Sequence, residues 1–150
     1  MASTYTALLI HVVFSTRDRR PLLDPAWVDA LYAYIGGILR EDGGRLVAAG
    51  GVEDHVHLVL QFKPDRSVSQ TLARLKAVSS KWLNQSGRLA ERFEWQRGYG
   101  AFSVSRSDLD SLRRYVAGQR EHHRRESYRD ELVRFLDEHC VEYEQRFLLG

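Results

Sequence analysis

The stretch EDHVHLVLQF, residues 53–62, decides how this chain folds. Apolar and polar positions alternate along it with a period of two, which is typical of a β-strand with one face in the core. The core face carries Val56, Leu58, Leu60 and Phe62. His55 and His57 share the opposite face, and the rise along a strand places their Cα atoms about 6.5–7 Å apart.

Two neighbouring imidazoles on one strand face are able to bind a single divalent metal ion. At this spacing His55 and His57 can converge on one ion and leave its other positions open for a third ligand and a substrate. The alternative is a pair of ordinary histidines on the surface of a sheet, which is the commoner situation for a bare His-x-His. The rest of the chain must decide between the two interpretations.

The composition predicts one domain, residues 1–150. With 43% hydrophobic and 28% charged residues, the chain has the make-up of an ordinary globular protein with a substantial core. No apolar run approaches the roughly 20 residues that cross a bilayer, so we expect no contact with a membrane. A single cysteine, Cys140, and a start without a basic leader indicate the cytoplasm.

Arginine dominates the positive charge, with 19 arginines among 22 basic residues. The planar guanidinium matches phosphate, which favours a nucleic-acid partner, although a GC-rich genome would give the same bias. One basic cluster is the loop RDRRP at 17–21, and another lies on a predicted helix. Each is either a solvated surface or a set of phosphate contacts, and the candidates are Arg17, Arg19, Arg20, Arg74 and Lys81.

The hydrophobic pattern predicts strands and helices in the order β-α-β-β-α-β, followed by further helices. The expected strands cover residues 6–14, 45–51, 55–62 and 100–104, with a turn at 50–53. The expected helices start at Asp24 and Ser67 and then cover 108–124 and 128–139. This order predicts an α+β protein of the ferredoxin-like split βαβ type, with an antiparallel sheet, helices on one face and additional C-terminal helices.

The predicted helix at 108–124 carries a second set of polar groups. Tyr115, Gln119 and His122 lie on one stripe beside the apolar stripe. The side-chain oxygen of Gln119 can complete a metal site with His55 and His57, and the phenol of Tyr115 would lie one turn away. The spacing Tyr-x-x-x-Gln alone is a weak signal, because an exposed helix often contains it.

Several motifs together resemble a known family. They are HVVFST at 11–16 with Arg19–Pro21, DHVHL at 54–58, SSKW at 79–82, the segment 95–103, and the segment 115–123. As a linked set they look like the single-tyrosine HUH transposases, the small TnpA-type enzymes of the simplest bacterial insertion sequences, which include repeat-associated tyrosine transposases. The resemblance covers nearly the whole chain. Gly118 departs from it, since we expect a larger polar residue there.

The resemblance implies a DNA transposase that works through covalent catalysis. Tyr115 would attack single-stranded DNA and form a 5′-phosphotyrosine, and the released 3′-hydroxyl would later rejoin strands. His55, His57 and Gln119 would bind Mg²⁺ or Mn²⁺. The substrate would carry hairpins near the cleavage site. The enzyme would be a homodimer in which the tyrosine helix of one subunit can complete the histidine site of the other.

Three alternatives remain open at this point. The chain could be a domesticated relative that acts on repeated genomic palindromes, or a non-catalytic protein that binds hairpin DNA through the basic residues named above. It could also be a plain ferredoxin-like domain with incidental histidines. His122 and His123 are interpreted as helix-surface groups, with His122 as a possible proton-transfer or phosphate-binding residue.

Overall fold

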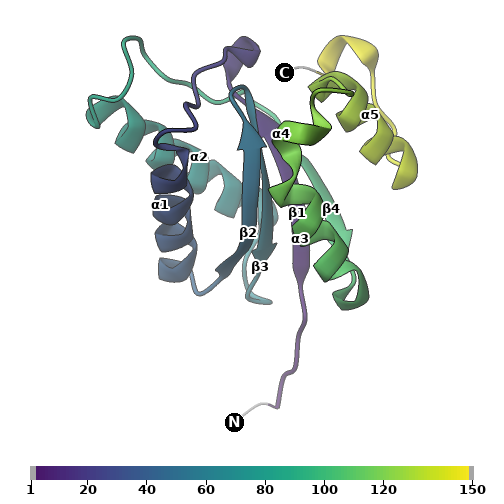
Figure 1. Ribbon diagram of the computed structural model, residues 1–150. Helices are drawn as coiled ribbons and strands as arrows, with labels where there is room; N and C mark the ends of the chain where they lie inside the picture. The colour runs from purple at the N-terminus through teal and green to yellow at the C-terminus, as the bar shows by residue number, and fades with distance from the viewer. Residues whose placement is uncertain (1–2, 149–150) are drawn as a thin grey trace.

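The computed structural model describes residues 3–148 and is built around a four-stranded sheet (Figure 1). The strand order is β2-β3-β1-β4 and every neighbouring pair is antiparallel. The strands are β1 (Leu9–Ser15), β2 (Arg45–Val52), β3 (His55–Gln61) and β4 (Gly100–Val104). This is the predicted ferredoxin-like α+β arrangement, and β3 is an inner strand that pairs with both β1 and β2.

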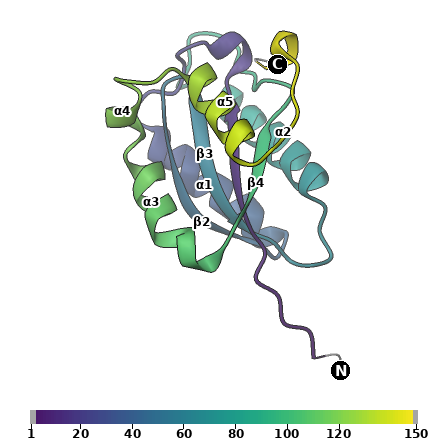
Figure 2. The ribbon, with the colours of Figure 1, turned by 90° about the vertical axis from the view of Figure 1, so that its right-hand side faces the viewer.

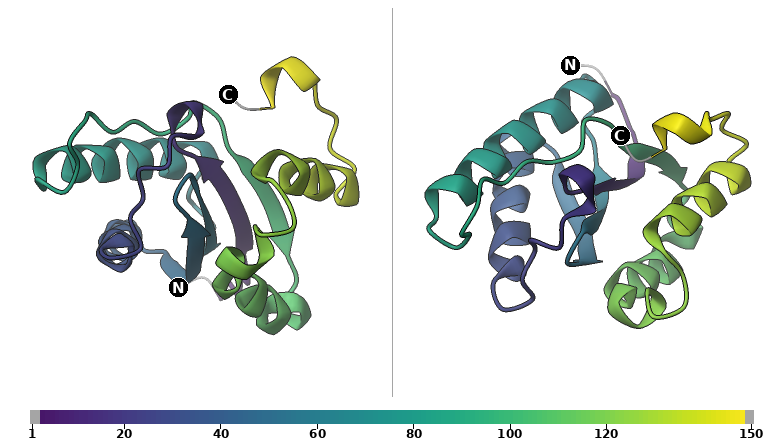
Figure 3. Two further views of the ribbon diagram at one scale, coloured as in Figure 1. Left: turned by 45° about the horizontal axis from the view of Figure 1, so that its top comes forward. Right: turned by 90° about the horizontal axis from the view of Figure 1, so that it is seen from above.

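Two long helices cover one face of the sheet, α1 (Val28–Glu41) and α2 (Val68–Gln85) (Figure 3). The main hydrophobic core lies between them and the sheet. The β3 residues Val56, Leu58, Leu60 and Phe62 all belong to this core, as the alternation predicts. Helix α1 begins at Val28 rather than Asp24, because Asp24 and the residues after it form a separate turn.

Three shorter helices cover the other face: α3 (Leu109–Ala117), α4 (Gln119–His122) and α5 (Tyr128–Glu138) (Figure 2). Helix α5 packs over β1 and β4 through Tyr128, Leu132, Phe135 and Leu136. Short 3-10 helices occur at Arg17–Arg19, Arg106–Asp108 and Gln145–Phe147. None of the helices within residues 3–148 has the length and apolar content needed to cross a bilayer.

The predicted single helix at 108–124 is wrong, because it is broken at Gly118. The backbone there has φ −93° and ψ 17°, and the Gly118 N–H donates to the carbonyls of Arg114 and Tyr115. Glycine is a poor residue for a helix interior, costing about 1 kcal/mol relative to alanine. The break separates α3, which carries Tyr115, from the short α4, and His123 follows directly after α4.

The predicted turn at 50–53 is also wrong, since β2 continues to Val52 and the turn is at Glu53 and Asp54. Gly50 and Gly51 pair with His57 and Val56 within the sheet. A Cβ at Gly50 would lie 2.9 Å from the carbonyl carbon of Val116 in α3. The glycine therefore allows the backbone of α3 to lie directly on β2, beside the histidine strand.

Candidate active site

His55 and His57 lie on the face of β3 that α3, α4 and α5 cover. Both are completely buried, so the interpretation as sheet-surface histidines is wrong. Their ring centroids are 5.3 Å apart and the rings are close to perpendicular. The strand geometry therefore brings the two imidazoles together as the alternation predicts, but in the interior of the protein and away from the sheet edge.

Glu131 of α5 lies at the centre of the site. Its Oε1 is 2.8 Å from His57 Nε2, 3.0 Å from His123 Nε2 and 3.5 Å from His55 Nε2. Burial alone would raise the pKa of this carboxyl, but hydrogen bonds with the three histidines hold the pKa far below its usual range. Glu131 is therefore ionised, fully buried and surrounded by imidazoles.

A second set of contacts orients the two strand histidines. His55 Nδ1 lies 2.7 Å from the carboxylate of Asp54, and His57 Nδ1 lies 2.9 Å from Nε2 of His11. Burial lowers the pKa of His57 to about 4 and that of His11 to about 3. For His55, burial acts in the same direction, but hydrogen bonding to Asp54 and Glu131 raises its pKa overall. In both strand histidines, Nε2 faces the shared site.

The phenol of Tyr115 reaches the same site from α3. Its hydroxyl donates a hydrogen bond to Glu131 Oε2, lies 3.1 Å from His122 Nε2, and accepts a hydrogen bond of 2.8 Å from Arg134. Its ring centroid is 5.8 Å from that of His57. Burial and the neighbouring Glu131 raise the pKa of the phenol, so Tyr115 is protonated in this state.

Gln119, the predicted third metal ligand, is also buried beside the tyrosine helix. Its Nε2 donates to the backbone carbonyl of Tyr115 at 3.2 Å. Its Oε1 is the buried side-chain atom that has no hydrogen-bond partner within residues 3–148. A buried carbonyl oxygen without a donor is costly, which makes it suitable for an additional cationic partner.

The donor atoms in this site suit a divalent metal ion. His55, His57, His123 and Glu131 each present a ligand atom, and these atoms all lie within 4.8 Å of one another. Imidazole nitrogens and a carboxylate oxygen are common ligands of divalent metals. The residues present therefore fit a divalent metal ion.

Sequence reasoning missed His123 and Glu131. His123, which we interpreted as a helix-surface group, has a side chain only 9% exposed, and it contacts both His55 and Glu131. Glu131 lies four residues before Phe135, so it falls on the apolar stripe of α5. A carboxylate on a buried stripe is the signal that could have drawn attention to it.

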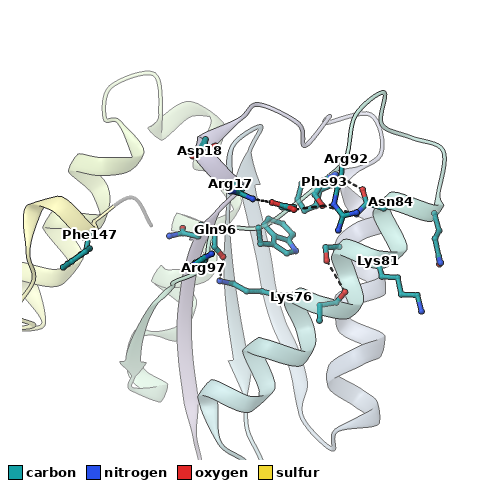
Figure 4. A pocket seen from close by; sticks show the side chains of 15 residues that line it. Arg17, Asp18, Lys76, Lys81, Asn84, Arg92, Phe93, Gln96, Arg97 and Phe147 are labelled. Carbon is teal, nitrogen blue, oxygen red and sulfur yellow. Dashed lines mark hydrogen bonds and ion pairs between the residues drawn. The ribbon is translucent and has the colours of Figure 1, made fainter.

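The five predicted DNA contacts do not form one patch. Arg17, Arg20 and Arg74 are ion-paired with Glu94, Glu91 and Glu41. Arg17 and Lys81 both line a groove of about 1000 Å³, beside Arg92 and the aromatic side chains of Phe93 and Trp95 (Figure 4). Arg19 instead lines a smaller hollow of about 530 Å³ next to His123 and Tyr128.

Comparison with known proteins identifies the family to which this chain belongs. The family model described as "Transposase IS200 like" matches residues 4–119. Over 120 residues the chain is 30% identical to the transposase for insertion sequence element IS200 of Salmonella typhimurium, covering 74% of this chain and 76% of that protein. The equivalent protein of Salmonella typhi matches equally well. The chain therefore belongs to the IS200-like transposases, which are enzymes acting on DNA.

Two solved structures share the fold. A putative transposase from Deinococcus radiodurans R1 matches with a TM-score of 0.63 and 21% identity, covering 77% of this chain and 93% of the other. A REP-associated tyrosine transposase bound to a REP hairpin matches with a TM-score of 0.57 and 15% identity, covering 77% and 68%. Helix α5, which carries Glu131, begins beyond the region that the family model matches.

Proposed function

We propose that this transposase cleaves and rejoins single-stranded DNA with Tyr115 as the nucleophile. The observation that carries the proposal is the position of the Tyr115 hydroxyl, which contacts the same Glu131 carboxylate as His57, within one chain. Family membership supports the reaction class, and the motif around Tyr115 supports the choice of this tyrosine.

In the proposed reaction, the phenol oxygen of Tyr115 attacks the phosphorus of a phosphodiester. The P–O bond to the 3′-oxygen breaks, which leaves a 5′-phosphotyrosine and a free 3′-hydroxyl. The phenol proton passes to Glu131 or His122, which both contact the hydroxyl, and the departing 3′-oxygen takes up a proton from solvent water. A 3′-hydroxyl later attacks the phosphotyrosine, which rejoins the strands at a second junction and releases Tyr115. The phosphotyrosine retains the energy of the broken phosphodiester bond, so no ATP is needed.

The proposed metal ligands are His55, His57 and Gln119, holding Mg²⁺ or Mn²⁺. When bound, such an ion supplies Lewis-acid stabilisation of the charge on the phosphoryl oxygens. Asp54 and His11 orient the two imidazoles through their Nδ1 atoms. Arg134, which donates to the Tyr115 hydroxyl, is placed to favour a negative charge on that oxygen as it reacts.

We propose that the substrate carries hairpins and that the groove in Figure 4 contacts its backbone. Five basic side chains line this groove, against two acidic ones: Arg17, Lys76, Lys81, Arg92 and Arg97, with Asp18 and Glu94. The REP-associated relative was solved with a hairpin, which supports the same class of ligand here. Arg19, Arg20 and Arg74 lie outside this groove and would contact other parts of the DNA.

A homodimer is also proposed, on the basis of the resemblance. Because Tyr115 and His57 already meet within one chain, a dimer does not need to share its active sites. If the two subunits exchanged α3, Tyr115 of one subunit would complete the histidine site of the other.

A denaturing gel tests the proposed function. The chain is incubated with single-stranded DNA carrying hairpin-flanked ends and with Mg²⁺ or Mn²⁺, and wild type is expected to form a covalent adduct. Tyr115→Phe should form none, while the control Tyr99→Phe, which alters a partly exposed tyrosine, should behave as wild type. An equal adduct yield from Tyr115→Phe contradicts the proposal. Hairpin binding by wild type without any adduct favours the non-catalytic alternative.

A further inference from the structure

Glu131 connects the histidines of the sheet to the tyrosine of α3. One carboxylate oxygen faces the Nε2 atoms of His57 and His123, at 2.8 and 3.0 Å. The other oxygen accepts the hydrogen bond from the Tyr115 hydroxyl. Among the described residues, no other side chain is hydrogen-bonded both to a strand histidine and to the phenol.

The hydrogen bonds around the imidazoles are those of metal ligands. Metal-bound histidines usually donate their second N–H to a carboxylate or another acceptor, which directs the free nitrogen toward the ion. His55 has this arrangement, with Nδ1 against the Asp54 carboxylate. When it donates that N–H, its Nε2 presents a lone pair, and this Nε2 lies 3.0 Å from His123 Nε2 and 3.5 Å from Glu131 Oε1.

The separations between the four donor atoms match a compact coordination shell. Four of these separations are 2.8, 3.0, 3.0 and 3.5 Å. Donors around a tetrahedral ion with bonds of about 2.0–2.1 Å are roughly 3.3 Å apart. Small shifts of side chains therefore suffice to place one ion among these atoms.

We propose that His123 and Glu131 are metal ligands together with His55 and His57, and that Glu131 links the bound metal to Tyr115 through its second oxygen. The site then has three imidazoles and one carboxylate, with Gln119 Oε1 of the proposed function as a further oxygen ligand. His123 and Glu131 both come from the segment after the Gly118 break. The catalytic use of this metal rests on the proposed function, whereas its binding does not. Of the two metals proposed above, such a nitrogen-rich set favours Mn²⁺ over Mg²⁺, which prefers oxygen ligands, and it also suits Co²⁺ or Zn²⁺.

The packing of α5 holds Glu131 in place for this role. Ser127 caps the helix by accepting from the Asp130 N–H at 3.1 Å. Tyr128, Leu132 and Phe135 anchor α5 in a cluster with β1 and β4. Since Glu131 projects from a helix that is fixed at its start and along its length, its carboxylate has little freedom to leave the histidines.

The test is metal binding by the full chain without DNA. Calorimetry with Mn²⁺ measures affinity, and the visible spectrum of added Co²⁺ reports its ligands. We expect Glu131→Gln and His123→Asn each to weaken affinity by at least 10-fold and to change the Co²⁺ spectrum. The control is Asp137→Asn, an exposed carboxylate on the same helix, which should leave both unchanged.

Pulsed electron paramagnetic resonance of Mn²⁺ bound to wild type adds a readout that needs no variant, because it counts coordinated imidazole nitrogens. Three histidines are expected, and two would overturn the proposal. A Glu131→Gln chain that keeps the metal affinity and Co²⁺ spectrum of wild type would also overturn the proposal, particularly if Gln119→Ala abolished metal binding. A chain that binds metal through Glu131 but forms no DNA adduct would refute the proposed function and leave this inference standing.

Discussion

Replacing Gly50 with alanine is expected to displace the tyrosine helix from the histidine strand. An alanine Cβ would lie 2.9 Å from the carbonyl carbon of Val116 and 3.1 Å from its Cγ1. The carbonyl oxygen of Val116 would lie closer still. Ordinary contacts between carbon atoms are about 3.5–4.0 Å, so α3 must move by at least about 1 Å. Tyr115 precedes Val116 in α3, so its hydroxyl shifts with the helix and its hydrogen bond to Glu131 is disturbed.

Two effects of this substitution are measurable. Overpacking of this kind lowers the free energy of unfolding by about 1–3 kcal/mol, which thermal denaturation detects. A misplacement of about 1 Å in an attacking group reduces the rate about 100-fold, which single-turnover adduct formation on hairpin-flanked DNA detects.

Gly37 provides the matched control for Gly50. It lies inside α1, and a Cβ there would meet nothing within 4 Å. Gly37→Ala should therefore keep the wild-type rate and gain up to about 1 kcal/mol of stability from helix propensity. A Gly50→Ala chain with wild-type stability and rate would refute the reasoning about how α3 is seated.

Three further predictions concern acid stability, DNA contacts and subunit composition. The pKa values of His11 and His57 are about 3 and about 4 in the folded chain, against 6.5 for free histidine, so the unfolded state binds more protons between pH 6.5 and 4. As the pH is lowered through this window, the free energy of unfolding of the metal-free protein should therefore decrease by up to about 2.7 kcal/mol per pH unit. His11→Gln should roughly halve that slope. An unchanged slope in this variant would contradict the assignment of these pKa values. Lys81→Ala should make the salt dependence of hairpin binding, measured as the slope of log binding constant against log salt concentration, shallower by about one phosphate contact. Arg45→Ala, which removes an exposed charge at the opposite end of the sheet, should leave this slope unchanged. Equal effects of the two substitutions would exclude the groove as the binding surface. Mixing His57→Ala chains with Tyr115→Phe chains should restore no adduct, because Tyr115 and His57 meet within one chain. Recovered adduct would indicate active sites shared between subunits.

The sheet and the positions of the strand histidines could be predicted because they depend on local periodicity. Alternation along β3 fixes which face His55 occupies, and the burial of Val56 on the other face agrees with it. The family motif likewise drew attention to Tyr115. These predictions needed no knowledge of long-range contacts.

The remainder of the site depends on contacts that no local pattern encodes. Glu131 and His57 are 74 positions apart, and His123 and His55 are 68 apart. His123 enters the site because the helix breaks at Gly118, and the tertiary consequence of that break is not visible in the spacing of residues. The sequence likewise predicts a turn at Gly50, because the close approach of α3 that requires a glycine there is a tertiary feature.

The most direct test of the account is to identify the residue that becomes attached to DNA. Wild-type protein is trapped with hairpin-flanked single-stranded DNA in the presence of Mn²⁺, digested with protease and nuclease, and analysed by tandem mass spectrometry. We expect a nucleotide attached to the Tyr115 phenol oxygen through its 5′-phosphate. Attachment to any other residue, or through a 3′-phosphate, would contradict it.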